Sequence, residues 1–148
     1  MSILKDILYK VAIESVTGST EIAINQLHFD SRKIVANDAF VAIRGTISDG
    51  HDFIEKAINL GATAIICDVL PENLINGVTY VCVKDTNAAL AFMAANFYNN
   101  PSQKLKLIGI TGTNGKTTIA SLLYQLFKKA GFKVGLLSTV KILVDETE

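Results

Sequence analysis

The first hundred positions alternate between strand-length apolar runs and segments with helical spacing. Apolar residues at helical spacing predict a short opening helix over 4–11. Two longer helices are predicted, one from Asp52 to Leu60 that Gly61 ends, and one from Asp85 or Thr86 to Tyr98. Apolar runs predict strands at 22–24, 27–29, 39–43, 62–67 and 79–83.

The pattern changes after residues 99–103, Asn-Asn-Pro-Ser-Gln, which are typical of a linker. A strand is predicted over 105–110, a long helix over 117–130, and a further strand from Lys133. A strand, helix and strand in this order normally join parallel strands with a right-handed crossover. The sequence therefore predicts an α/β fold with a small first domain, 1–103, and the first β-α-β unit of a second domain, 104–148.

A glycine-rich segment, Thr-Gly-Thr-Asn-Gly-Lys-Thr-Thr at 111–118, separates the predicted strand from the long helix. Glycines let backbone N–H groups approach phosphates closely, and the helix start adds its positive end. A lysine suits the β- and γ-phosphates of ATP, and the next hydroxyl suits Mg²⁺. We therefore expect Lys116 and Thr117 to be catalytic, Thr117 to ligate Mg²⁺, and ATP to contact Gly112, Thr113, Asn114, Gly115, Lys116, Thr117 and Thr118.

The match to the general phosphate-loop pattern G-x-x-x-x-G-K-[ST] is incomplete. Ile110 stands where the first glycine is expected, and Gly109 lies one position earlier. An ordinary glycine turn is one alternative, but it would not require a lysine and a threonine at the helix start. A GTPase or a small kinase is another, although the chain has no N-K-x-D motif for guanine.

Charge and cysteine usage exclude several classes of protein. The 14 basic residues balance the 14 acidic ones, which disfavours nucleic acid as a partner. No apolar stretch approaches the roughly 20 residues of a membrane span, and no secretory signal is evident, so we expect no membrane insertion and a cytoplasmic protein. Cys67 and Cys82 are expected to be buried and inert. His28 and His51 are expected to be structural, with Asp49-Gly50-His51 forming a turn that caps a helix.

The segment 109–118 resembles the phosphate loop of the Mur ligases, ATP-dependent enzymes of peptidoglycan synthesis. Its T-G-T-N-G-K-T-T form is most similar to the MurE branch. The likeness to MurF is weaker because that loop usually lacks the Thr-Asn pair, and folylpolyglutamate synthases commonly continue T-N-G-K with Gly-Ser. The resemblance spans the whole chain, because it extends to the segments 30–32, 38–42, 49–53 and 97–101.

The resemblance implies that residues 1–103 bind UDP-MurNAc. By position, Phe29 would lie beside the uracil, while Ser31 and the loop Thr46-Ile47-Ser48 would contact the uridine diphosphate. The loop differs from the His-Gln-Ala of some relatives, a change that backbone contacts would survive. From the residues alone, Asp30-Ser31-Arg32 is also compatible with a surface turn and an ion pair.

The resemblance further implies a ligase that uses ATP and Mg²⁺ to add a free amino acid to UDP-MurNAc-L-Ala-D-Glu through an acyl phosphate. Meso-diaminopimelate is expected ahead of L-lysine, and the full-length enzyme is expected to be monomeric. Residues 105–148 fall short of the about 100 residues of a typical domain, so we expect an inactive N-terminal fragment. The alternatives are a MurF-type ligase and a stand-alone UDP-sugar or nucleotide-binding module.

Overall fold

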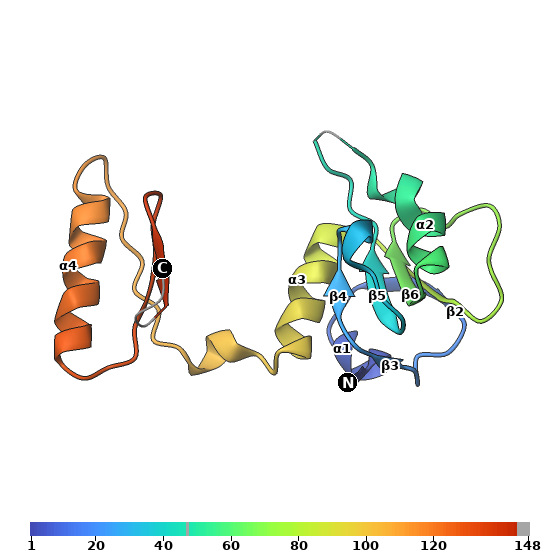
Figure 1. Ribbon diagram of the computed structural model, residues 1–148, viewed down its shortest axis with the longest axis horizontal. Helices are drawn as coiled ribbons and strands as arrows, with labels where there is room; N and C mark the ends of the chain where they lie inside the picture. Colours follow the sequence, from blue (N-terminus) through green and yellow to red (C-terminus); the bar gives the residue numbers. More distant parts are fainter. Residues whose placement is uncertain (47, 145–148) are drawn as a thin grey trace. The chain divides into compact units, whose positions relative to one another are not determined.

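The computed structural model describes residues 1–46 and 48–144, and the chain divides into two compact units, 1–105 and 106–148 (Figure 1). The segment between the last helix of the first unit and the second unit contains a short 3-10 helix, η3 (Pro101–Lys104). Asn99 and Asn100 precede it with φ of 58° and 51°. Asparagine tolerates this left-handed conformation, which ends the preceding helix.

A five-stranded mixed sheet with the order β2-β7-β6-β5-β4 forms the centre of the first unit. Four strands are parallel, and the edge strand β2 runs antiparallel to β7. The strands are β2 (Ile13–Thr17), β4 (Leu27–His28), β5 (Asp38–Val41), β6 (Ala62–Cys67) and β7 (Thr79–Val83). All residues of β5 and β7 are buried, as expected for strands covered on both faces.

Helices cover both faces of this sheet. One apolar cluster joins alternate strand residues such as Val41 and Ile66 to α1 (Leu4–Ile7) and α3 (Thr86–Phe97). A second cluster joins the intervening strand residues, Phe40 and Ile65 among them, to α2 (Ile54–Asn59). Successive side chains of a strand point to opposite faces, so the same strands supply both clusters.

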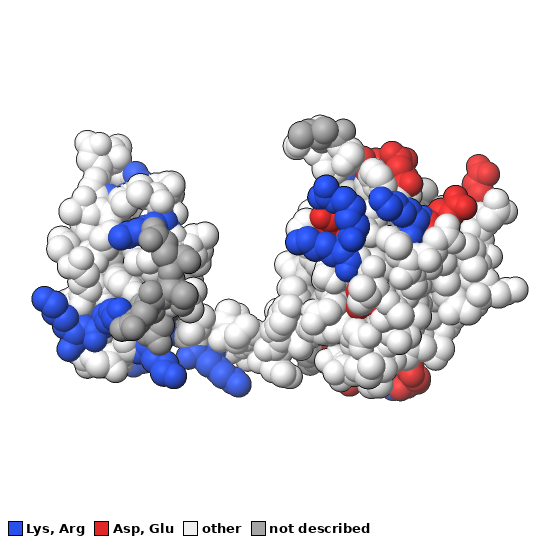
Figure 2. Space-filling view, in the orientation of Figure 1, with Lys and Arg blue, Asp and Glu red and all other residues white. Residues whose placement is uncertain are grey.

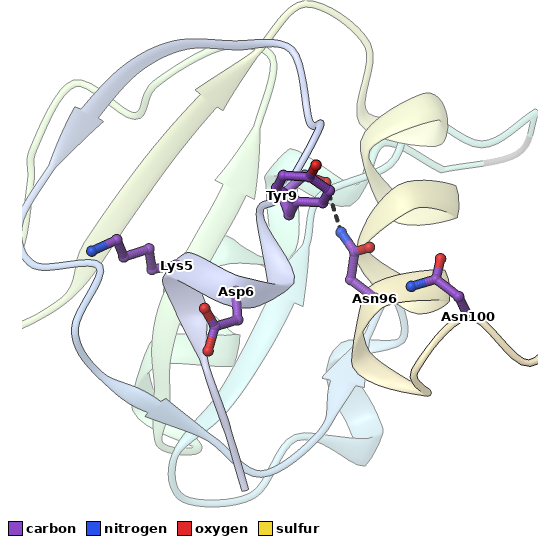
Figure 3. Close-up of a pocket in the computed structure, with 5 residues that line it drawn as sticks. All are labelled: Lys5, Asp6, Tyr9, Asn96 and Asn100. Atoms are coloured by element: carbon purple, nitrogen blue, oxygen red, sulfur yellow. Dashed lines mark hydrogen bonds between the residues drawn. The ribbon is translucent and has the colours of Figure 1, made fainter.

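Two local features fix α3. The Asp85 side chain accepts hydrogen bonds from the N–H groups of Asn87 and Ala88, at 2.8 and 3.1 Å, so Asp85 rather than Thr86 is the N-cap. Near the other end, Asn96 Nδ2 donates to the carbonyls of Ile7 and Tyr9, at 3.0 and 2.7 Å (Figure 3). These bonds connect the end of α3 to the turn that follows α1.

The strands predicted within 39–43, 62–67 and 79–83 are confirmed, while the opening segment differs from expectation. The first helix covers four residues rather than reaching position 11, because Lys10 has a φ of 63° that a helix cannot continue. The edge strand β2 was not predicted, since all of its residues are exposed and it lacks an apolar run. The segment predicted as a strand at 22–24 contributes β3 (Ala23–Ile24), which pairs with β1 (Ser2–Ile3) in a separate small sheet.

The second unit contains one long helix, α4 (Lys116–Lys129), and an antiparallel hairpin of β8 (Gly135–Leu137) and β9 (Ile142–Val144). Gly131 ends α4 with a φ of 84°, and Phe132 N–H returns to the Phe127 carbonyl at 3.1 Å. The long helix is thus confirmed, including its glycine stop.

The predicted strand over 105–110 and the parallel β-α-β unit are wrong for this chain. Residues 106–110 form no strand, and β8 pairs with β9 rather than with that segment. A strand needs a neighbour to pair with, and Leu107 is 91% exposed here. Of the apolar residues that the structure describes in this unit, Leu136 alone is buried.

Candidate functional site

The glycine-rich loop leads into the N-terminus of α4. Gly115 is the N-cap, with a φ of 78°, and Gly112 has a φ of 146°. Both values favour glycine, and a Cβ at Gly115 would meet no atom within 4 Å, so the space beside the loop is open. The first N–H groups of a helix have no partner within it, and they lie here beside that space.

Lys116 folds back over this loop. Its Nζ donates to the carbonyls of Gly112 and Thr113, at 2.5 and 3.2 Å. The ammonium is therefore held at the loop, on the first residue of α4. Thr117 and Thr118 follow it in the first turn, so the sequence-predicted phosphate-loop residues of 112–118 are contiguous and mostly exposed.

The second unit has an excess of basic residues, although basic and acidic residues are equal in number over the whole chain. The unit has six lysines, against the three acidic residues Asp145, Glu146 and Glu148, so the basic residues are in excess by three; the lysines are Lys106, Lys116, Lys128, Lys129, Lys133 and Lys141. Among the described residues of this unit, Figure 2 shows basic side chains on the face in view. Such an excess favours anions, including a nucleotide triphosphate. Counting charges separately for each predicted domain would have found it.

The residues predicted to contact uridine diphosphate follow two neighbouring parallel strands. Phe29 and Ser31 come after β4, while Thr46 and Ser48 come after β5, so both segments leave the carboxyl edge of the sheet (Figure 1). Ligands of open α/β sheets bind at this edge. Phe29 is 64% exposed, Thr46 and Ser48 are exposed, and Ser31 is only 7% exposed. The predicted contact of Ile47 lies outside the described residues.

A short turn organises the segment around Ser31. Asp30 is the N-cap of η1 (Ser31–Lys33), and its carboxylate accepts two hydrogen bonds from the Arg32 guanidinium, both at 2.8 Å. These bonds, together with one from the Arg32 backbone N–H, hold the pKa of Asp30 well below its usual range. The segment is therefore the ion-paired turn that the sequence left open as one interpretation.

Four charged or ionisable side chains meet at the ends of β5 and β6. His51 Nδ1 lies 2.6 Å from Asp49 Oδ1. His51 Nε2 lies 2.8 Å from Asp68 Oδ1, although the angle of this contact is not that of a hydrogen bond. Arg44 approaches the same two carboxylates, at 3.8 and 3.3 Å. We call these four residues the His51 cluster.

The sequence alone does not predict that these four side chains meet. The predicted turn at Asp49 is confirmed. The Asp49 side chain accepts a hydrogen bond from the His51 N–H at 2.9 Å, as the N-cap of η2 (Gly50–Phe53). Asp68 lies 17 positions further along the chain and meets His51 only because β5 and β6 are paired.

The other histidine has a buried partner. His28 Nε2 lies 3.5 Å from Asp38 Oδ2, and the Asp38 side chain is fully buried. The same Asp38 oxygen accepts the Val35 N–H at 2.9 Å. These contacts bind β4 to the start of β5, which agrees with the structural role expected for His28.

Other features of the described chain add no second site. A pocket of about 410 Å³ lies between α1 and the end of α3, and it includes none of the predicted site residues; its lining residues are Lys5, Asp6, Tyr9, Asn96 and Asn100 (Figure 3). Among described residues, no three His, Cys, Asp or Glu side chains gather as a metal site. No described helix is long and apolar enough to cross a membrane.

Both parts of the chain match known protein families. Residues 23–98 match the Mur ligase family, catalytic domain, and residues 110–148 match the Mur ligase middle domain. The first match covers the chain from β3 to the end of α3, and the second covers the phosphate loop and α4. The expected resemblance is thereby confirmed in both parts.

Two similar curated proteins are both named as diaminopimelate ligases. The chain is 50% identical over 144 residues to the UDP-N-acetylmuramoyl-L-alanyl-D-glutamate–2,6-diaminopimelate ligase of Cytophaga hutchinsonii, and 48% identical over 137 residues to a ligase of that name from Clostridium acetobutylicum. These alignments cover 97% and 93% of this chain, but 30% and 28% of the relatives. The chain thus spans about a third or less of the length of the relatives that it matches.

Solved structures give the same family. A MurF ligase from Thermotoga maritima in complex with ADP is 33% identical, with a TM-score of 0.52, over 71% of this chain and 23% of that one. A diaminopimelate ligase structure superimposes with a TM-score of 0.67 over 97% of this chain and 28% of that one; at 20% identity it supports the fold alone. From its two family matches and these relatives, we conclude that the chain belongs to the Mur ligase family.

Proposed function

We propose that this chain supplies the UDP-substrate-binding part and the phosphate loop of an ATP-dependent ligase that adds meso-diaminopimelate to UDP-MurNAc-L-Ala-D-Glu. The observation that carries the proposal is identity of 43–50% across almost the whole chain to ligases that bear this activity in their names. The proposal includes a cytoplasmic enzyme, since its proposed substrates, ATP and a UDP-linked sugar, are cytoplasmic metabolites. It also includes a monomeric full-length enzyme, as the family resemblance implies.

The loop before α4 suits the triphosphate of ATP. Gly112 and Gly115 leave the loop free of side chains where phosphates would approach, and the α4 N-terminus favours negative charge. Lys116 is already held at the loop through two carbonyls, from which it can turn to phosphate oxygens. Thr113, Asn114, Thr117 and Thr118 complete the proposed ATP contacts, and we assign Lys116 and Thr117 the catalytic roles.

This loop offers one ligand for Mg²⁺. The Thr117 hydroxyl is the ligand that this chain would offer, and Mg²⁺ commonly takes one or two protein ligands together with substrate phosphates. That mode of binding needs no cluster of protein carboxylates. When bound, the ion would offset negative charge on the phosphates.

The carboxyl edge of the sheet suits the UDP end of the other substrate. The exposed Phe29 ring offers an aromatic face to a base, and the amides and hydroxyls of the loop at Thr46 and Ser48 suit diphosphate oxygens. Ile47, outside the described residues, belongs to the same proposed loop. Ser31 is nearly buried, so its proposed contact depends on a small displacement of the Asp30 turn.

The chemistry follows from the substrates. A carboxylate resists attack by an amine because its oxygen is a poor leaving group. Transfer of the γ-phosphoryl group from ATP to the terminal carboxylate of UDP-MurNAc-L-Ala-D-Glu gives an acyl phosphate and ADP. The amine of diaminopimelate then forms the amide bond, and inorganic phosphate leaves. Lys116 would stabilise the negative charge on the transferring phosphoryl group.

A MurF-type ligase is the second candidate, since three solved structures of MurF ligases, 29–33% identical, match 71–72% of this chain. The two candidates differ in the amine that they use. The name of a related ligase of Acinetobacter baumannii joins D-alanyl-D-alanine to a UDP-linked sugar that already carries diaminopimelate.

The test uses the protein at the length at which its source cells produce it. We expect phosphate release from ATP that requires both UDP-MurNAc-L-Ala-D-Glu and meso-diaminopimelate, measured with a coupled phosphate assay. Release that instead requires the UDP-linked tripeptide and D-alanyl-D-alanine would favour the MurF type. Binding of the UDP-sugar without any ATP turnover would favour a stand-alone binding module, and would contradict the ligase.

A further inference from the structure

The loop that carries Thr46 and Ser48 is closed at its base by backbone contacts. Arg44 and Asp49 form an antiparallel bridge, Gly45 N–H donates to the Ser48 carbonyl at 3.0 Å, and Gly50 N–H donates to the Ile43 carbonyl at 2.8 Å. We call the described residues of this loop, 44–46 and 48–49, the hairpin loop. It leaves the end of β5 and returns directly beside it.

The return of this loop is tightly packed. A Cβ on Gly50 would lie 2.6 Å from both the backbone N and the backbone O of Ile43. Such distances do not occur for real Cβ atoms, so only glycine allows the chain to return this closely. The base of the hairpin loop therefore has one geometry.

The His51 cluster holds the same loop from the side. Arg44 and Asp49 are the first and last residues of the hairpin loop, His51 follows it, and Asp68 comes directly after β6. β5 and β6 are paired, and the Ala42 N–H donates to the Ile66 carbonyl at 2.8 Å. The cluster thus joins both ends of the loop to the neighbouring strand.

The cluster is polar and lies outside the apolar clusters of the unit. The His51 side chain is 15% exposed, whereas Asp68, Asp49 and Arg44 are increasingly exposed, at 27, 40 and 54%. Partial burial shields the polar contacts of His51 with both carboxylates from water, so they are stronger than the same contacts on an open surface.

From this arrangement we infer that His51 and Asp68 are positioning residues, which fix the hairpin loop so that the hydroxyls and backbone amides of Thr46 and Ser48 meet the diphosphate of the UDP-linked substrate. The inference rests on the proposed function and assigns a task to residues outside the predicted contact set. A preformed loop binds more tightly because less conformational freedom is lost when the ligand arrives. Neither residue is expected to act on ATP.

The test compares His51→Gln and Asp68→Asn with the wild type, in the protein at its native length. Asp52→Asn is the matched control, because Asp52 is exposed, lies next to His51 and is outside the cluster. We expect each cluster variant to raise the KM for UDP-MurNAc-L-Ala-D-Glu about tenfold, equivalent to about 1.4 kcal/mol. The KM for ATP and kcat should stay within about twofold, and the control should match the wild type in all three constants.

A second measurement needs no turnover. Hydrogen exchange of the Gly45 and Gly50 amides reports whether the hairpin loop stays closed, since both N–H groups are bonded within or at the base of it. We expect both amides to exchange at least about tenfold faster in His51→Gln and in Asp68→Asn, while amides of β6 and β7 keep their protection.

Three results would contradict these assignments. An unchanged KM for the UDP-linked substrate in both cluster variants, with unchanged exchange at Gly45 and Gly50, would overturn the inference alone. Equal losses in both KM values and in kcat would also overturn it, because a general structural defect does not produce a selective effect on one substrate. A wild-type protein without saturable dependence on the UDP-linked substrate would overturn the proposed function, and the inference with it.

Discussion

Cys67 and Cys82 are register partners on the neighbouring parallel strands β6 and β7, and both are free, buried thiols. Burial raises the pKa of Cys67 to about 12, with a further contribution from the adjacent Cys82. Burial also raises the pKa of Cys82, and the Glu14 carboxylate adds to the effect. The expected inert character of these cysteines therefore has a physical cause, because the thiolate is the reactive form.

This pair should make the fold sensitive to alkali. In the unfolded chain each thiol has a pKa near 9, whereas in the folded chain Cys67 keeps its proton up to about pH 12. Stability is unaffected below pH 9 and falls as the pH rises from about 9 to 12, since only the unfolded chain then loses protons. Urea unfolding at pH 7 to 11 should show this fall, and Cys67→Ala should reduce it. Rapid labelling of both thiols by an alkylating reagent in the folded protein at pH 8 would contradict the argument.

Lys116 is expected to be essential for turnover. Lys116→Met removes the one lysine that lies over the phosphate loop while keeping the length of the side chain. We expect kcat to fall about 100-fold or more, the usual effect of losing a group that stabilises charge in a transition state. The KM for the UDP-linked substrate should change little. Lys133→Met, an exposed change in the same unit, is the control and should leave the rate unchanged.

Gly50 should tolerate no side chain. Gly50→Ala forces a Cβ against the backbone of Ile43, at 2.6 Å, so strand β5 or the hairpin loop must move. We expect a loss of about 1–3 kcal/mol in the free energy of unfolding, measured by urea denaturation. Gly109→Ala offers a comparison, since its Cβ would meet nothing within 4 Å and its φ is not in the left-handed range. Equal stability of the two variants would refute the steric argument.

The cap of α3 should contribute measurably to stability. Asp85→Ala removes both hydrogen bonds to the first turn, and we expect a loss of about 1 kcal/mol, within the range of 0.5–2 kcal/mol for such caps. Asp85→Ser should recover most of this loss because its hydroxyl can accept the same bonds. If Asp85→Ser proves as unstable as Asp85→Ala, the hydrogen bonds are not the cause.

Residues 1–105 should fold without the second unit. Every buried apolar residue that the structure describes belongs to this unit, except Leu136. Deletion of residues 106–148 should therefore shift the melting temperature by less than about 4 °C, which corresponds to less than about 1 kcal/mol. Residues 106–148 alone should give no cooperative transition, since one helix and a two-stranded hairpin bury too little apolar surface. Circular dichroism during heating would measure both.

Local patterns were sufficient for much of the molecule. The apolar runs at 62–67 and 79–83 became β6 and β7 at the predicted bounds, and Asp85 capped α3 as predicted. The glycine-rich loop and Lys116 came from the sequence as well, because phosphate binding by backbone N–H groups needs a short contiguous segment. Features such as caps, turns and phosphate loops can be predicted from the sequence because the residues that form them lie within a few positions of each other.

Pairing between distant segments decided the rest. β2 carries no apolar run and exists because β7 offers it a free edge, while residues 106–110 carry an apolar run and remain unpaired because no strand lies beside them. His51 and Asp68 likewise meet only through the pairing of β5 with β6. The sequence determined where the chain turns, where it is capped and where it can bind phosphate. The tertiary structure alone decided which edges pair and which charges meet, since strand pairing and ion pairs depend on distances in space between residues far apart in the chain.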